Sequence, residues 1–216
     1  MVSGLTVRTG RRGGRRSSRR ARQLLVDFRK QSILAAARSV FARHGFAGTT
    51  GDLIARQADV AKGTLYLYYR SKSAIYAAAL ISGLEQLTRE TVRVTGGRQP
   101  LLAVLRAFFE TRQRFVEENL DFFRIYSTEA AKIGTAAAQV QREVARLQDA
   151  QIDALRRAIA AAIDAGEIRR VDPRTAALAT FDLSHGAIVR RMRSRRSSRT
   201  GPADALELLW KGLSPR

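Results

Sequence analysis

The chain of 216 residues has no cysteine and only two histidines. Without cysteine there is no disulfide bond, no catalytic thiolate and no cysteine-based zinc site. His44 and His185 lie far apart in the sequence, so we expect neither a bound metal nor a cofactor. Phosphate-binding loops and paired carboxylates in a recognisable frame are also missing, which makes an enzyme the weakest functional class.

Long apolar runs and, at one end, acidic residues are missing as well. No apolar run approaches the roughly 20 residues of a membrane-spanning helix, so we expect no membrane span and a cytoplasmic protein. The first 26 residues contain no acid, and arginine alternates there with glycine and serine at Arg8, Arg11, Arg12, Arg15, Arg16, Arg19, Arg20 and Arg22. Residues 1–26 are therefore predicted to form a disordered, Arg-rich arm. Three interpretations stay open: an arm that contacts DNA, a transit-peptide-like segment, or a solvated tail lengthened by a misassigned start codon.

The charge balance favours a polyanionic partner. Lysine and arginine number 39 against 19 acidic residues, which gives a formal net charge of +20 at pH 7. This charge exceeds what solubility requires and points to nucleic acid or to an anionic membrane surface. Hydrophobic residues make up 45% of the chain, which is enough for a buried core. We therefore expect a folded protein that binds a polyanion.

Apolar residues recur at helical spacing along the rest of the chain, and neither an alternating strand pattern nor an internal repeat is present. Start and stop signals support the helices: Gly45 and Gly166 as breaks, Thr49 or Thr50, Ser71 and Asp172 as N-caps. The predicted helices cover 27–44, 50–57, 62–68, 72–94, 100–115 and beyond, about 120–130, a long stretch that stops at Gly166, 173–192 and 203–211. The predicted fold is all-α, with an N-terminal three-helix domain at 27–72 and a C-terminal helical bundle at 73–216.

The stretch 48–72, GTTGDLIARQADVAKGTLYLYYRSK, predicts two short helices joined by a four-residue turn. This is the geometry of a helix-turn-helix, whose second helix lies in the major groove of DNA. Leu65 and Tyr69 are predicted to face inward. Tyr66 and Tyr68 are predicted to face outward, with hydroxyl groups that donate to phosphate oxygens.

The start of the second predicted helix carries groups suited to a phosphate backbone. Lys62 and Thr64 project from its first turn, and Gly63 lets the helix backbone come close to DNA. Lys72 adds a positive charge beside the next helix N-terminus. An isolated apolar run such as 65–69 would more often be core, but the ordered set of turn, glycine, threonine, tyrosine and lysine favours DNA binding.

The segment 41–80, FARHGFAGTTGDLIARQADVAKGTLYLYYRSKSAIYAAAL, resembles the DNA-binding domain of the TetR family of bacterial transcriptional regulators. The matching positions occur in order and at fixed spacing: Phe41, Gly45, Phe46, Thr49, Thr50, Ile54, Ala55, Val60, Lys62, Gly63, Thr64, Leu65, Tyr66, Ser71 and Lys72. The resemblance implies a dimeric, all-helical repressor whose variable C-terminal domain binds a small effector and releases DNA. The DNA-binding residues expected on this basis are Thr49, Thr50, Lys62, Gly63, Thr64, Tyr66, Leu67, Tyr68 and Lys72.

Four positions depart from the family pattern. Gly51 stands where some members present a side chain to a base, so that contact is lost. Asp59 stands where the turn usually has glycine, and aspartate adopts the left-handed conformation at modest cost. Ala61 replaces the usual serine, which weakens one phosphate contact. Tyr69 replaces the usual phenylalanine, and its hydroxyl needs a partner if it is buried.

Aromatic residues cluster between the fifth and sixth predicted helices, where the resemblance implies an effector pocket. Aromatics at helical spacing are also common in ordinary cores, so both readings of this cluster stay open. The expected effector-pocket residues are Phe108, Phe109, Phe115, Phe122, Phe123, Tyr126 and Phe181. The sequence does not identify the effector.

The helix that begins at Pro173 has a seam of residues at alternating three- and four-residue steps, as a coiled-coil face does. The resemblance implies that the last two helices build a four-helix dimer interface, and an intramolecular core face is the alternative. The expected dimer-interface residues are Leu178, Phe181, His185, Ile188, Met192, Leu208 and Leu209.

We therefore expect a sequence-specific DNA-binding regulator, a repressor that leaves a palindromic double-stranded operator when a small-molecule effector binds. It is expected to be a bacterial, cytoplasmic homodimer that associates with the nucleoid when bound to DNA. A nucleoid-type protein that coats DNA with low specificity is the main alternative, because the net charge also suits it. Binding of the arm to a membrane surface is a further possibility.

Overall fold

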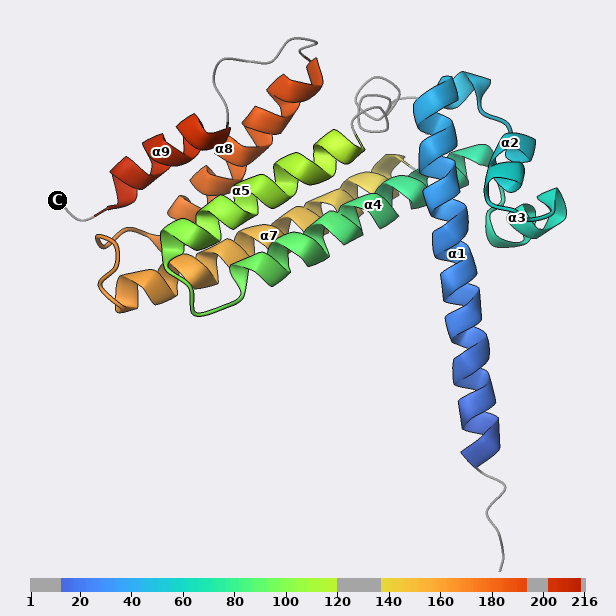
Figure 1. Cartoon of the computed structure of the whole chain (residues 1–216), viewed down its shortest axis with the longest axis horizontal. Coiled ribbons are helices and arrows are strands. Elements are labelled where there is room, and N and C mark those ends of the chain that lie inside the picture. The colour runs from blue at the N-terminus through green and yellow to red at the C-terminus, as the bar shows by residue number, and fades with distance from the viewer. Residues whose placement is uncertain (1–12, 120–136, 194–201, 215–216) are drawn as a thin grey trace, which may run out of the picture.

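The computed structural model describes residues 13–119, 137–193 and 202–214, and every regular element in these ranges is an α-helix (Figure 1). The predicted helix at about 120–130 lies outside the described residues. The described helices confirm the all-α class. In chain order they are α1 (Gly13–Gly48), α2 (Gly51–Gln57), α3 (Lys62–Tyr68), α4 (Lys72–Thr95), α5 (Leu101–Glu118), α7 (Ala137–Asp164), α8 (Pro173–Arg193) and α9 (Pro202–Leu213).

Helix α1 is longer than the sequence pattern predicts. It begins at Gly13 and extends away from the rest of the chain in Figure 1, so residues 13–26 are helical where a disordered arm was expected. Arginine, alanine, leucine and glutamine are good helix formers, and the helix continues from the buried 33–41 segment without a new nucleation step. Gly45 interrupts the helix as predicted, because its φ of 67° and ψ of 175° suit essentially only glycine.

The two short helices form the predicted helix-turn-helix. Thr50 caps α2, because its Oγ1 accepts a hydrogen bond of 3.3 Å from the Leu53 N–H. Asp59 adopts a left-handed φ of 52° in the turn, where the sequence departs from the usual glycine. The fully buried Ile54 and Leu65 belong to the core of the N-terminal domain, in which α2 packs against both α1 and α3.

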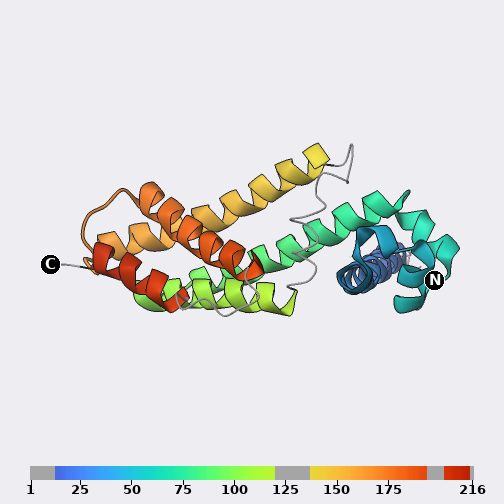
Figure 2. The ribbon, with the colours of Figure 1, turned by 90° about the horizontal axis from the view of Figure 1, so that it is seen from above.

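Helix α4 belongs to both halves of the molecule. Ser71 caps it, because the Ser71 Oγ accepts a hydrogen bond of 3.1 Å from the Ala74 N–H. Its first turns place Ile75 and Tyr76 in the core of the N-terminal domain, while its later turns pack beside α5 and α7 (Figure 2). A movement of α4 would therefore change the packing of both the N-terminal domain and the C-terminal bundle.

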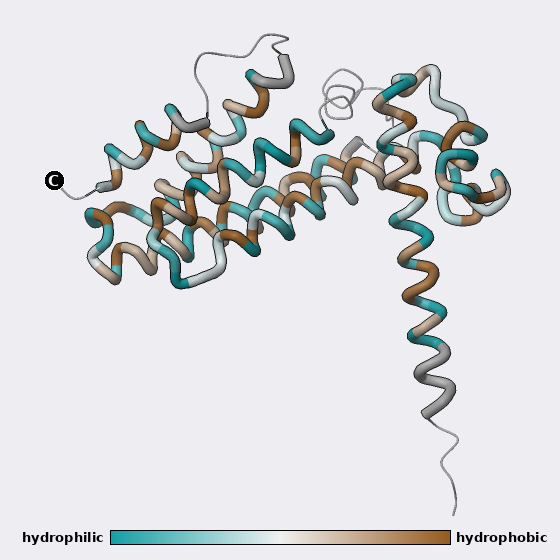
Figure 3. The backbone as a smooth tube through the Cα atoms, viewed as in Figure 1, coloured by the Kyte–Doolittle hydropathy of each residue, from teal (hydrophilic) through white to brown (hydrophobic). Residues whose placement is uncertain are grey.

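Helices α5, α7, α8 and α9 form the C-terminal bundle around a second core. Polar and apolar residues alternate along each of these helices in Figure 3, as helices with one buried face require. The helix break at Gly166, where φ is 72°, stands where the sequence predicts it. The predicted N-cap Asp172 is also confirmed, because its carboxylate accepts a hydrogen bond of 2.6 Å from the Thr175 N–H. The core consists mainly of Leu101, Leu105, Phe108, Phe109, Leu155, Ile159, Ala177 and Phe181.

Candidate DNA-binding surface and ligand pocket

Helix α3 presents one anchored face and one open face. Leu65 is fully buried, whereas Leu67 is 83% exposed and Tyr66 is 41% exposed. Lys62 and Gly63 are exposed at the start of the helix. An apolar side chain as open as Leu67 suits contact with a thymine methyl group in the major groove.

Gly51 makes room for Tyr66. A Cβ atom at Gly51 would lie 2.5 Å from the Tyr66 hydroxyl oxygen and 3.1 Å from two of its ring carbons. The phenol therefore rests directly on the first residue of α2. The glycine at position 51 therefore allows the Tyr66 ring to lie where it does.

The next two tyrosines, Tyr68 and Tyr69, both pack against the core of the N-terminal domain. Tyr68 was expected to face outward, but it is half-buried and packs against the core of the N-terminal domain. Tyr69 also packs against this core, as predicted. Burial and the neighbouring Tyr68 raise the pKa of Tyr69 to about 12, so its phenol is neutral at pH 7.

Lys62 is engaged on the protein surface. Its Nζ donates a hydrogen bond of 2.8 Å to Asp52 Oδ2, an exposed ion pair between α3 and α2. The hydrogen bond from Lys62 to Asp52 raises the pKa of the lysine. Ala61 provides no side-chain cap for α3. A phosphate would have to compete with Asp52 for this ammonium group.

Two of the residues predicted to bind DNA make hydrogen bonds within the chain. The Lys72 Nζ donates to the carbonyls of Phe46 (2.7 Å) and Thr49 (3.1 Å) and lies 4.6 Å from the centroid of the Phe46 ring. Thr49 is 1% exposed, and its hydroxyl donates a hydrogen bond of 2.6 Å to the Gly45 carbonyl. Lys72 and Thr49 therefore hold the end of α1 against the starts of α2 and α4, where a positive charge stabilises a helix C-terminus.

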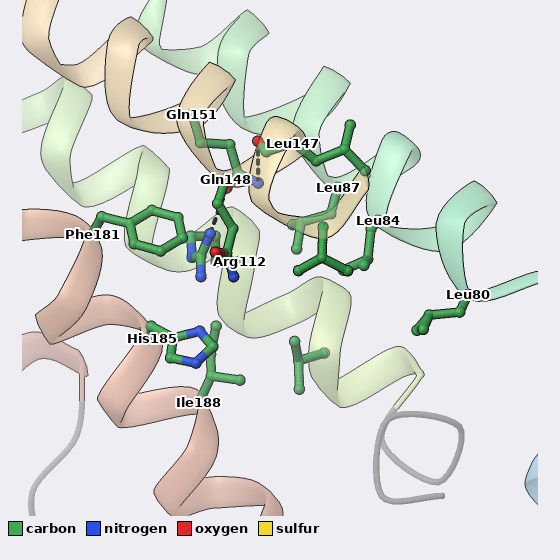
Figure 4. A pocket seen from close by; sticks show the side chains of 12 residues that line it. Leu80, Leu84, Leu87, Arg112, Leu147, Gln148, Gln151, Phe181, His185 and Ile188 are labelled. Atoms are coloured by element: carbon green, nitrogen blue, oxygen red, sulfur yellow. Dashed lines mark hydrogen bonds between the residues drawn. The ribbon is translucent and has the colours of Figure 1, made fainter. Parts of the chain in front are cut away.

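The C-terminal bundle contains a cavity of about 110 Å³ between α4, α5, α7 and α8 (Figure 4). Most of its wall is aliphatic. Four polar side chains also reach it, and none of the lining residues is acidic. The lining residues are Leu80, Leu84, Leu87, Arg112, Val116, Val144, Leu147, Gln148, Gln151, Phe181, His185 and Ile188.

Arg112 is the most unusual of these residues, because it is only 3% exposed. Its Nε donates a hydrogen bond of 2.9 Å to Ser184 Oγ, and its Nη1 donates a second hydrogen bond to Gln151 Oε1. The guanidinium carbon lies 4.4 Å from the ring centroid of Phe181. Burial lowers the pKa of Arg112 to about 10, so the side chain is still charged at pH 7.

Of the predicted effector-pocket residues that the structure describes, Phe181 alone lines the cavity. Phe108, Phe109 and Phe115 are buried but do not line it, because their rings fill the cores on either side. Phe122, Phe123 and Tyr126 lie outside the described residues. The sequence pattern missed Arg112, although a charged residue in register with Phe108 and Phe115 on one helix face is a usable signal.

The predicted dimer residues are divided between two environments. Phe181, His185 and Ile188 line the cavity, so this part of the seam faces the inside of the same chain. Leu178 is exposed, and Leu208 is 70% exposed. Leu209 packs partly against the second core, and the side chain of Met192 lies outside the described residues.

Over the ranges that the structure describes, no helix has the length and apolar character needed to cross a membrane. The same ranges hold no group of three or more histidine, aspartate or glutamate side chains that could bind a metal ion.

An anchored helix-turn-helix with an open second helix, joined by α4 to a bundle with a cavity, defines a DNA-binding regulator with a ligand domain. Residues 33–79 match the model of the bacterial regulatory proteins of the tetR family. The HTH-type transcriptional activator FasR of Mycolicibacterium smegmatis is 33% identical over 167 residues, covering 72% of this chain and 73% of FasR. The chain belongs to the TetR family of bacterial transcriptional regulators.

Solved structures show the same fold. FadR of Bacillus subtilis in complex with stearoyl-CoA matches with a TM-score of 0.64 at 19% identity, covering 84% of this chain and 98% of that one. The TetR family regulator PfmR of Thermus thermophilus matches with a TM-score of 0.58 at 23% identity, covering 83% and 93%. As a member of this family, the chain is a DNA-binding transcriptional regulator and not an enzyme.

Proposed function

We propose that the chain binds a partly palindromic operator as a homodimer, and that a small effector in the cavity releases it. The observation that supports this best is the dual position of α4. Leu80 belongs to the core of the N-terminal domain and also lines the cavity, and Leu84 and Leu87 continue that wall. An effector that displaces these leucines shifts α4, and α4 carries the N-terminal domain with it.

The proposed DNA contacts lie on the open side of the helix-turn-helix. Leu67 and Tyr66 reach into the major groove, while Lys62, Gly63 and Thr64 approach the backbone with the first turn of α3. Thr50 and the hydroxyl of Tyr68 supply further phosphate contacts. Thr49 and Lys72 are left out because their polar groups are occupied within the chain.

The homodimer is proposed to form through α8 and α9. Leu178, Leu183 and Leu208 are exposed on these helices, and apolar patches of this kind often mark a subunit interface. Two copies would then read half-sites about 34 Å, or a multiple of that distance, apart. Light scattering at micromolar concentration would show twice the 23.9 kDa chain mass, and a mass of one chain would refute the dimer.

The effector is proposed to carry an apolar chain or ring. The cavity wall is mostly aliphatic, and the structurally similar FadR was solved with stearoyl-CoA. In the cell, the protein is proposed to lie in the bacterial cytoplasm and on the nucleoid when bound to DNA. The direction of regulation is proposed to be repression, although the similar FasR is an activator.

Selection from a random duplex library at about 0.2 M salt tests this function, because nonspecific phosphate contacts are much weaker there. We expect an enriched inverted repeat whose half-sites match the dimer spacing. DNA that is retained without any enriched motif would contradict the proposal and favour a low-specificity coating protein, which the net charge of +20 would suit.

The Arg-rich segment is proposed to add affinity without sequence preference. The exposed Arg19, Arg20 and Arg22 continue α1 away from the core, where they can reach phosphates that flank the operator. Deleting residues 1–25 should flatten the slope of log affinity against log salt and leave the selected motif unchanged. A changed motif would mean that the arm reads bases.

A further inference from the structure

The cavity contains a buried positive charge that has no negative partner among the described residues. Arg112 is 3% exposed, and within the described residues its guanidinium contacts a hydroxyl, an amide oxygen and two aromatic rings. None of these partners carries a full negative charge. Its Nη2 group donates no hydrogen bond within the described part of the chain.

Such an arrangement is incomplete on its own. A guanidinium out of water is stabilised only when opposite charge and further hydrogen bonds replace its hydration. The ring faces of Phe181 and Phe108 and the amide of Gln151 replace part of it. Because no carboxylate among the described residues completes the site, an anion from outside has a place to bind.

The groups around Arg112 hold it in position for such an anion. Gln151 points its Oε1 at the guanidinium because its Nε2 donates 3.0 Å to Thr88 Oγ1. Ser184 accepts from Nε and fixes the other edge of the plane. With Nε and Nη1 engaged, the Nη2 group is left for a ligand.

The polar and apolar ends of the cavity are separate. In Figure 4, Arg112 and His185 lie toward one end, and Leu80, Leu84 and Leu87 lie toward the other. His185 stacks on Phe181 with ring centroids 6.1 Å apart. Burial and the charge of Arg112 lower the pKa of His185, so the imidazole is neutral at pH 7 and has one N–H to donate.

We propose that the ligand of this cavity is an organic monocarboxylate. Its carboxylate binds Nη2 of Arg112, and its apolar body extends along Leu80, Leu84 and Leu87. This proposal rests on the proposed function, in which the cavity holds the effector. The proposal distinguishes the free acid from its thioester, because the thioester group that replaces the carboxylate at Arg112 is neutral.

Calorimetric titration of the full chain with three probes of equal chain length tests the chemical class. The probes are octanoate, 1-octanol and octanoyl-CoA, with hexanoate and decanoate to vary the length of the apolar body. We expect octanoate to bind at least about 10-fold more tightly than 1-octanol and more tightly than octanoyl-CoA. Equal affinities of acid and alcohol, tighter binding of the thioester, or no binding of any of the three acids would overturn the proposal.

Two matched variants locate the carboxylate. Arg112→Met keeps an unbranched side chain in the cavity and removes the charge, which buried sites often tolerate without unfolding. We expect it to lose about 10- to 100-fold in octanoate affinity and to keep its 1-octanol affinity within about 3-fold. Arg114→Met removes the same charge from the exposed side of α5 and should bind octanoate as the wild type does.

Further measurements keep the test independent of folding and of the DNA-binding proposal. Arg112→Lys retains a charge without the forked donors and should bind octanoate with intermediate affinity. Circular dichroism melting shows whether each variant is folded, and undiminished octanoate binding by folded Arg112→Met would refute the site. If the operator is selected but no acid binds, this inference alone fails. If octanoate binds but operator affinity is unchanged, the carboxylate site stands and the effector role in the proposed function fails.

Discussion

Replacing Gly63 by alanine separates the stability of α3 from its contact with DNA. A Cβ atom built at Gly63 has no heavy atom within 4 Å, and the residue is exposed in the first turn of the helix. The methyl group therefore costs nothing inside the protein. It also removes backbone freedom from the unfolded chain, so the free protein should become more stable.

The expected gain is about 0.5–1 kcal/mol, which corresponds to roughly 1–4 °C in melting temperature for a chain of this size. On the operator, the same methyl group stands between the helix backbone and DNA. Crowding of a close contact by one carbon costs about 1–3 kcal/mol, so operator affinity should fall about 5- to 150-fold. Thermal melting and fluorescence anisotropy on one preparation measure both effects.

Gly97→Ala is the matched control. Gly97 is also exposed, its φ is not left-handed, and its added Cβ likewise meets nothing within 4 Å, but it lies in the loop after α4, away from the helix-turn-helix and from the proposed dimer helices. It should gain stability without losing operator affinity. Wild-type operator affinity in Gly63→Ala would refute the close approach of α3 to DNA, and a loss of stability would contradict the open space around Gly63.

The remaining predictions concern three other positions. Lys72→Met removes donors from two half-buried carbonyls and should lower the free energy of unfolding by about 1–3 kcal/mol, measured by urea titration; unchanged stability would contradict the tie. Gly51→Ala should reduce operator affinity by displacing the Tyr66 phenol, and Tyr66→Phe in the same chain should restore part of that loss, because the 2.5 Å contact involves the hydroxyl oxygen. An additive loss in the double variant would argue against this contact. The lowered pKa of His185 means that the folded chain binds fewer protons there than the unfolded chain, so stability falls as pH drops below about 6.5. Wild type should therefore lose more stability than His185→Gln between pH 7.5 and 5.5 in thermal melts, and equal losses would show that His185 is not responsible.

Local signals in the sequence predicted most of the helix boundaries. Thr50, Ser71 and Asp172 cap helices because a hydroxyl or carboxylate three residues from a free N–H is a local arrangement. Gly45 interrupts α1 for an equally local reason, its backbone conformation. Such features depend on neighbours in the chain, so one sequence is enough to find them.

Sequence reasoning is least informative where a side chain interacts with a distant segment of the chain. Lys72 meets carbonyls more than 20 residues away, so nothing in its own neighbourhood separates a structural tie from a phosphate contact. Arg112 depends on partners in α7 and α8 for the same reason. Helical spacing showed that Phe108 and Phe115 are buried, but it does not show whether space remains between the helices.

The length of α1 involves a different balance. High net positive charge and the Gly-Ser content favoured disorder for residues 1–26, whereas the helix propensity of arginine and leucine favours extension of a helix that is already nucleated. In the structure, the second effect decides the segment from Gly13 onward. The composition of residues 1–26 carries no information about the stable helix that follows and that this segment extends.

The most direct test of the account compares the affinity of the chain for its selected operator with its affinity for a scrambled duplex of the same length and base composition, at about 0.2 M salt. A regulator that reads bases through α3 should prefer the operator by about 10³-fold or more. The preference should persist when residues 1–25 are removed. A ratio near one in both forms would contradict sequence reading by α3 and leave only the charge to explain DNA binding.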